Sequence, residues 1–192
     1  MKYTAKDYSG LLGTQGFSDN QLNVHFKLYE GYVANTNKVI EQLEALSKAG
    51  DFGPAYAELK RRFGWEFDGM RMHEYYFDNM SKEIKEMDAS GKFAALVAER
   101  YGSVDAWRAD FVATGAMRGI GWAVCALDEK TNILHNAWVN EHDAGQLAGA
   151  KPLLVMDVFE HAFVFDYGMK RAEYIDAFMN AVNWEEVDGR LD

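Results

Sequence analysis

The stretch VMDVFEHAF, residues 155–163, places three ionisable side chains in an otherwise apolar and aromatic run. These side chains are Asp157, Glu160 and His161. Charged groups in such surroundings are costly unless they are paired or bind a metal ion. The run therefore predicts partners for these side chains elsewhere in the chain.

Two further histidines, His25 and His73, fall on apolar faces of predicted helices. A single histidine of this kind is most often a core residue bonded to a backbone carbonyl, and that interpretation stays open for each one alone. Taken with Asp157 and His161, they form a set of three imidazoles and one carboxylate. Nitrogen and oxygen donors without thiolates suit zinc, iron or manganese better than copper(I) or an iron–sulfur cluster. The set predicts one metal site.

Other catalytic motifs are missing from the sequence. There is no HExxH, which a zinc protease of that class needs, and no histidine has a glutamate three residues before it, as di-iron bundles require. There is also no G-x-S-x-G nucleophile motif. A zinc hydrolase of another kind stays open as an alternative, although no spare carboxylate stands out as its general base.

Composition and charge limit the kinds of binding partner that we expect. The 192 residues carry a formal net charge of −10 without a basic block, so we expect no nucleic-acid partner. No apolar run approaches the roughly 20 residues that span a bilayer, so we expect no membrane partner. The single cysteine, Cys125, permits no internal disulfide and suits a reducing compartment. We expect a cytoplasmic protein.

The first half of the chain reads as helical. Ser18 followed by Gln21 predicts a helix start, and residues 48–50 predict its end. Pro54 opens a predicted short helix that ends near Gly64, and a second long helix is predicted from about residue 69 to 87. Two long helices joined by a short turn favour an antiparallel hairpin. We expect a domain boundary near residue 88.

The second half changes its periodicity. Helices are predicted over 93–101 and 105–117, the latter capped by Ser103, and a closing helix over 171–182. GWAVCALD and ILHNAWV flank the turn EKTN as a β-hairpin, and PLLVMDV gives a third strand. The predicted fold class is α+β, with an N-terminal long α-helical hairpin domain (1–88) and a C-terminal domain (89–192) that holds a three-stranded antiparallel sheet and helices.

Two segments are typical of one enzyme family: DVFEHAF at 157–163 is close to a D-x-W-E-H-A-Y signature, and GIGWAV from Gly119 matches a G-x-G-W segment. In these segments the sequence resembles the iron/manganese superoxide dismutases. DYGMKRAEYIDAFMNAVNW, from 166 to 184, has the family's Tyr, Arg and terminal Asn-Trp at matching spacing. The match runs in order along essentially the whole chain.

The resemblance implies an enzyme that converts superoxide to dioxygen and hydrogen peroxide. Its one iron or manganese ion per subunit would alternate between two oxidation states, held by four ligands: His25, His73, Asp157 and His161. A low-activity metal-binding homologue with a structural or metal-storage role remains the alternative.

The resemblance also implies a set of residues around the ligands. His142, in the loop NEHDAG, would bond the solvent bound to the metal; histidine at this position often accompanies iron, which we favour over manganese. The family's gateway Tyr stands eight residues after the first ligand, where this chain has Val33. Tyr32 stands seven residues after His25, so we expect a helix without the family's extra residue and Tyr32 as the proton donor. A solvated loop histidine and ordinary helix packing are the respective alternatives.

Several family positions are altered. Tyr29 stands where the family has a gateway His, and Val164 where it has the Tyr that pairs with that His across a dimer. Phe159 and Phe163 replace a Trp and a Tyr of the aromatic cage, whereas Trp122 is kept. We expect coordination to be preserved and the rate or product inhibition to change.

Two charged residues complete the implied site. Glu160 would cross a two-fold axis to the partner's ligand histidine, which predicts a homodimer or a higher homo-oligomer; its alternative is a surface carboxylate. Arg171, together with Lys27, would attract superoxide, and the alternative for Arg171 is to anchor the closing segment.

Overall fold

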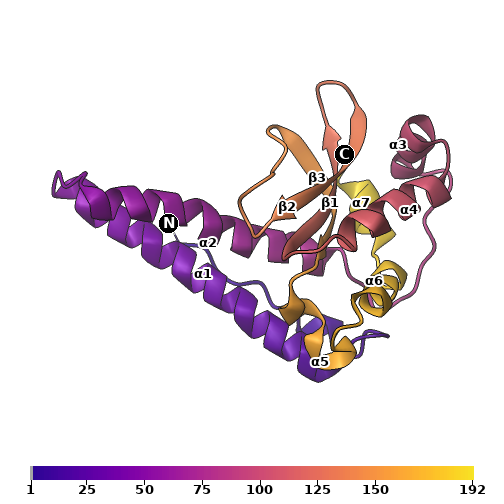
Figure 1. Ribbon diagram of the computed structural model, residues 1–192, viewed down its shortest axis with the longest axis horizontal. Coiled ribbons are helices and arrows are strands. Elements are labelled where there is room, and N and C mark those ends of the chain that lie inside the picture. Colours follow the sequence, from indigo (N-terminus) through magenta and orange to yellow (C-terminus); the bar gives the residue numbers. More distant parts are fainter. Residues whose placement is uncertain (1) are drawn as a thin grey trace.

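A long helical hairpin forms the N-terminal half of the computed structural model, which describes residues 2–192. Helix α1 spans Asp19–Lys48 and α2 spans Pro54–Asp78; they run side by side in Figure 1, preceded by a short 3-10 turn at Ser9–Leu11. The Ser18 hydroxyl accepts a hydrogen bond from the backbone N–H of Gln21. Both ends of α1 and the hairpin are therefore confirmed.

The predicted break near Gly64 is wrong. Helix α2 is continuous through this glycine, which lowers helix propensity by about 1 kcal/mol relative to alanine but does not stop a helix. The prediction of a helix reaching residue 87 is also wrong. The helix ends at Asp78, because the next residue, Asn79, turns its amide toward the sheet and bonds the backbone of Leu153 and Val155.

The C-terminal half supplies shorter helices. Helix α3 spans Lys92–Tyr101 and α4 spans Val104–Gly115, and the Ser103 side chain caps α4 as predicted. The closing helix is shorter than predicted, and a seventh helix follows it. The remaining elements are a 3-10 turn at Glu160–Ala162, α5 at Val164–Tyr167, α6 at Arg171–Asn180 and α7 at Trp184–Gly189.

Three antiparallel strands form the sheet in the order β2-β1-β3, with bounds Gly121–Asp128 for β1, Ile133–Asn140 for β2 and Ala150–Asp157 for β3. The central strand β1 is almost wholly buried because it has a strand on each side and helices over the sheet. Its Trp122 is paired with Asp157, the last residue of β3. The α+β class and the three predicted strands are confirmed; the division into two domains at residue 88 stays a prediction.

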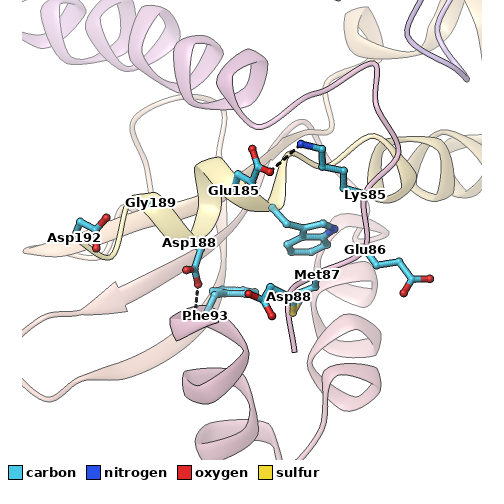
Figure 2. A pocket seen from close by; sticks show the side chains of 10 residues that line it. Lys85, Glu86, Met87, Asp88, Phe93, Glu185, Asp188, Gly189 and Asp192 are labelled. Atoms are coloured by element: carbon cyan, nitrogen blue, oxygen red, sulfur yellow. Dashed lines mark hydrogen bonds and ion pairs between the residues drawn. The ribbon is translucent and has the colours of Figure 1, made fainter. Parts of the chain in front are cut away.

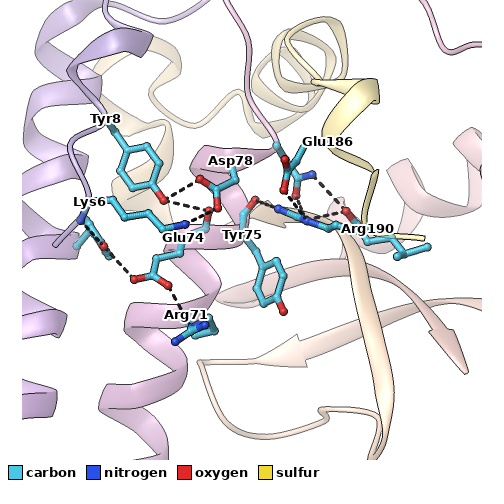
Figure 3. A network of polar contacts seen from close by, with 11 residues as sticks. Lys6, Tyr8, Arg71, Glu74, Tyr75, Asp78, Glu186 and Arg190 are labelled. Carbon is cyan, nitrogen blue, oxygen red and sulfur yellow. Dashed lines mark hydrogen bonds and ion pairs between the residues drawn. The ribbon is translucent and has the colours of Figure 1, made fainter. Parts of the chain in front are cut away.

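The β1–β3 ladder contains a bulge. Cys125 pairs with Leu154 and Ala126 with Pro152, so Leu153 is the extra residue of β3. Its carbonyl accepts a hydrogen bond from the Arg190 guanidinium at 2.8 Å and another from the Asn79 amide at 3.2 Å. Figure 3 shows Arg190 beside Glu186 and Tyr75, where the C-terminus meets α2. The bulge is thus fixed by one side chain at the end of α2 and one that follows α7.

Within residues 2–192, the helices are all too short or too polar to cross a lipid bilayer.

Candidate metal centre

Four side chains from four elements meet at the junction of the hairpin and the sheet. His25 comes from α1, His73 from α2, Asp157 from the end of β3 and His161 from the 3-10 turn that follows. One nitrogen or oxygen atom from each lies within 4.8 Å of the others. Asp157 Oδ2 is 3.2, 3.5 and 3.0 Å from Nε2 of the three histidines, in chain order. The predicted set is therefore brought together.

Hydrogen bonds to the backbone orient these groups. His73 Nδ1 lies 2.5 Å from the Gly69 carbonyl oxygen, one turn earlier in α2, so this nitrogen donates and Nε2 faces the cluster. The Asp157 carboxylate accepts from the backbone N–H of Phe159 through Oδ1, which leaves Oδ2 for the histidines. The Gln21 amide donates to the His161 carbonyl. These are the outer contacts that commonly fix metal-ligating side chains.

The donor set fits a divalent or trivalent cation. His73 Nε2 is buried and has no hydrogen-bond partner, a condition that costs about 1–3 kcal/mol unless something fills it. Burial lowers the pKa of His25 and of His73, which keeps both imidazoles neutral and able to bind a metal. Although burial acts to raise it, the imidazoles of His161 and His25 hold the pKa of Asp157 below its usual range. Three imidazole nitrogens and one carboxylate oxygen suit iron or manganese.

A second buried pair borders the cluster. The Tyr32 oxygen lies 2.8 Å from His142 Nε2, and Trp122 Nε1 donates to His142 Nδ1 at 3.1 Å. The alternative of a solvated loop histidine is wrong, because His142 is fully buried. The Tyr32 ring also stacks on His73, with 5.2 Å between ring centroids. Helix α1 is regular from end to end, so Tyr32 shares a face with His25 as the spacing of seven requires.

The protons of this pair follow from its partners. An indole N–H is only a donor, so His142 Nδ1 must accept. Burial lowers the pKa of His142 to about 4, so the ring is neutral near pH 7 and carries its proton on Nε2. Nε2–H therefore donates to the Tyr32 oxygen, and the Tyr32 O–H is left free to donate to another group.

Trp65 packs on the outer side of this pair and is absent from the sequence-based site. Its ring centroid is 4.5 Å from that of His142 and 5.5 Å from that of Tyr32. The predicted break after Gly64 placed Trp65 in a linker. The available signal was its spacing of eight residues before His73, which places both on one helical face.

Tyr29 uses its hydroxyl away from the Tyr32–His142 pair. It is fully buried, donates to Glu74 Oε1 and accepts from the backbone N–H of Lys6, both at 3.0 Å. Figure 3 shows Glu74 on α2, near the N-terminal residues Lys6 and Tyr8, which both bond Asp78 of the same helix. Tyr29 therefore ties the N-terminal segment to the hairpin.

The remaining predicted residues lie around the rim. Glu160 is exposed, and so is Val164. Arg171 donates to the backbone carbonyls of Met117 and Gly119 at 2.6 and 2.8 Å, which is the anchoring arrangement. Phe159 stacks on both His142 and His161 and closes one wall of the site.

A surface pocket near the C-terminus lies apart from this centre (Figure 2). Its lining includes Trp184, Phe93 and several carboxylates, but none of the four clustered residues. Lys85 pairs with Glu185, and Asp188 accepts from the backbone N–H of Phe93. The lining contains no histidine, so the pocket offers no donor set like that of the metal centre.

Known proteins are similar to this chain in sequence. The family model for iron/manganese superoxide dismutases, C-terminal domain, matches residues 89–190. Superoxide dismutase [Mn] 2 of Haloferax volcanii is 35% identical over 168 residues, 88% of this chain and 83% of that protein. Superoxide dismutase [Fe] of Aquifex pyrophilus is 34% identical over an alignment that covers 100% of this chain and 92% of that protein. Superoxide dismutase [Mn] of Nocardia asteroides is 33% identical over 96% of this chain and 88% of its own length. With a family model over more than half of the chain and relatives at this identity over most of it, the protein belongs to the iron/manganese superoxide dismutase family.

Proposed function

We propose that this protein is a superoxide dismutase whose single iron or manganese ion is held by His25, His73, Asp157 and His161. The observation that carries the proposal is the convergence of one donor atom from each residue within 4.8 Å, with His73 Nε2 buried and unpartnered. An ion held by these residues would supply the one-electron redox chemistry that the reaction requires. The sum is two superoxide anions and two protons giving dioxygen and hydrogen peroxide.

The chain's own residues would supply one of those protons. The Tyr32 O–H is free to donate because its oxygen already accepts from His142. The pair Tyr32–His142 is the proposed proton source, and Trp122 sets the His142 tautomer that frees it. Superoxide is small enough to need no built pocket beyond this aromatic enclosure.

Between the two metals, we propose iron. The support is the histidine at position 142, and the relatives include proteins named for each metal. Loading metal-free protein with either ion and measuring superoxide removal tests this choice. Higher activity per bound manganese than per bound iron would reverse it.

We propose a homodimer whose contact surface contains Glu160. Support comes from the rim of the centre, where Glu160 is exposed beside the partly exposed His161. The neighbouring apolar side chains of Val164, Phe165 and Met169 are 41, 57 and 87% exposed. Light scattering of the purified protein tests the oligomeric state, and a monomer at micromolar concentration would contradict it. The single cysteine supports a cytoplasmic location, which fractionation of the source cells tests.

The decisive test combines elemental analysis with a superoxide-removal assay. We expect about one metal ion per chain and activity that disappears in His73→Ala along with the metal. His135→Ala is the matched control, because His135 lies on β2 outside the cluster. Protein with full metal content and no activity would indicate the storage alternative.

A further inference from the structure

Trp65 holds a position that no predicted site residue explains. It lies on α2, two turns before His73, and its ring covers the outer side of both His142 and Tyr32. The centroid distances of 4.5 Å to His142 and 5.5 Å to Tyr32 are those of aromatic side chains in contact. Its indole is thus the outermost layer over the proposed proton source.

One face of the indole is held by a residue of the same helix, α2. The Arg62 guanidinium lies 4.0 Å from the Trp65 ring centroid, a cation–π distance. Arg62 is held in turn by Glu66, whose Oε1 accepts from the guanidinium at 2.7 Å. Glu66 is 3% exposed, so this partner is fixed within the hairpin.

The other side of the indole is fastened to the loop that carries His142. Trp65 Nε1 donates to Glu141 Oε2 at 3.0 Å. Glu141 precedes His142 directly and adopts a left-handed backbone conformation, with φ of 50°. Its side chain therefore ties the loop after β2 to helix α2 at the point where the loop delivers His142.

We propose that Trp65 is a positioning residue that keeps the hydrogen bond between Tyr32 and His142 aligned. Its own ring is held by the contacts with Glu141 and Arg62. This inference rests on the proposed function. On that proposal, one of the two protons that leave with hydrogen peroxide comes from the Tyr32 oxygen and the other from solvent, and solvent water then reprotonates Tyr32. Loosening Trp65 lets His142 move relative to Tyr32, so the loss falls on proton supply rather than on access of superoxide to the centre.

The mildest test changes Glu141, which is exposed. Glu141→Asn shortens the side chain beyond reach of Nε1 and tolerates the left-handed conformation, whereas Glu141→Gln keeps an acceptor oxygen at full length. Losing one hydrogen bond corresponds to roughly a threefold to tenfold fall in kcat. We expect that fall in Glu141→Asn with kcat/KM nearly unchanged, and recovery in Glu141→Gln.

Trp65→Leu removes the aromatic ring together with its contacts to Glu141 and Arg62. We expect a larger fall in kcat than in Glu141→Asn, again with kcat/KM nearly unchanged. Trp184→Leu is the matched control. Trp184 packs on Phe93 and Trp107, so its replacement lowers the stability of the protein without changing a contact of His142. Amide hydrogen exchange of residues 141–146, followed by mass spectrometry, is the second measurement. Faster exchange in Glu141→Asn and Trp65→Leu, but not in Glu141→Gln or Trp184→Leu, is the expected result.

Two outcomes overturn the inference. Equal kcat and equal exchange in Glu141→Asn and wild type would show that the bond does not hold His142. A fall of kcat/KM with kcat unchanged in Trp65→Leu would place Trp65 in substrate access instead. Both outcomes presuppose an active, metal-loaded wild type; an inactive wild type would overturn the proposed function itself.

Discussion

The Tyr32 oxygen accepts a hydrogen bond from His142 Nε2 at 2.8 Å, and both side chains are buried beside the candidate metal centre. One residue comes from the first helix and the other from the loop after the second strand. The bond therefore joins the helical hairpin to the sheet at the point where chemistry is proposed. Removing it has consequences for turnover and for stability.

Tyr32→Phe deletes the acceptor and leaves the ring in place. We expect kcat to fall by at least about tenfold, because a positioned general acid contributes roughly 10²–10⁴ in rate. The free energy of unfolding should fall by about 1–3 kcal/mol, since the His142 N–H stays buried without a partner. Stopped-flow superoxide decay and urea unfolding measure the two effects. Tyr56→Phe, near the hairpin turn, is the control; a Tyr32→Phe protein with wild-type kcat would remove Tyr32 from the proton path.

Gly69→Ala should displace Tyr32. A Cβ added at Gly69 would meet Cδ1 and Cε1 of the Tyr32 ring at 2.5 and 2.7 Å, well inside contact distance. Overpacking of this kind costs about 1–3 kcal/mol, and the shifted ring would no longer align with His142. Gly64→Ala on the same helix meets nothing within 4 Å and should stabilise the protein by about 1 kcal/mol through helix propensity. Thermal unfolding of both variants checks the contrast, and equal melting temperatures would contradict it.

Metal-free protein should lose stability between pH 7 and pH 5. His142 has a folded-state pKa of about 4, lowered by burial from 6.5, so only the unfolded chain takes up this proton as the pH falls below about 6.5. The contribution of His142 to the free energy of unfolding is fully present above that pH. It decreases as the pH falls from there to the folded-state pKa. The loss at pH 5 is roughly 2 kcal/mol from this group, with His25 and His73 acting in the same direction. Urea unfolding at several pH values measures the slope. The slope should flatten in His142→Gln, and an unchanged slope there would refute the assignment.

The contribution of Asp68 to stability should have the opposite pH dependence to that of His142, and Asp68→Asn should remove it. Burial, with a smaller effect from Asp143, raises the pKa of Asp68 to about 6. The folded state therefore holds this proton more tightly than the unfolded state, and wild-type stability falls as the pH rises from about 4 to above 6. Asparagine does not titrate, so the variant should be more stable than wild type at pH 8. Its advantage in stability over wild type should be smaller at pH 5. Paired thermal scans at these pH values test this, and the same difference at both would rule it out.

Local signals predicted most of the fold. The Ser18 and Ser103 caps, the hairpin around EKTN and the strand ending at Asp157 were recoverable because each depends on neighbouring residues. The end of α2 was not, because Asn79 stops that helix by bonding a strand more than 70 residues away. Gly64 gave a false stop, since a single glycine in a packed helix is overruled by its neighbours' burial.

The candidate site divides in the same way. The four clustered residues followed from their types together with the resemblance, and the structure brings them together. Trp65 was missed because its role depends on Arg62, Glu141 and His142 meeting in space. The direction of the Tyr29 hydroxyl was equally out of reach, because it depends on Lys6 and Glu74.

The bulge at Leu153 sets which way Asp157 faces. Side chains alternate along a strand, so one residue more or less between Pro152 and Asp157 would turn the carboxylate to the opposite face of the sheet. The carbonyl of that extra residue accepts hydrogen bonds from Arg190 and from Asn79. These two side chains thus keep the phase of a strand whose last residue lies at the candidate metal centre, although neither of them lies at that centre.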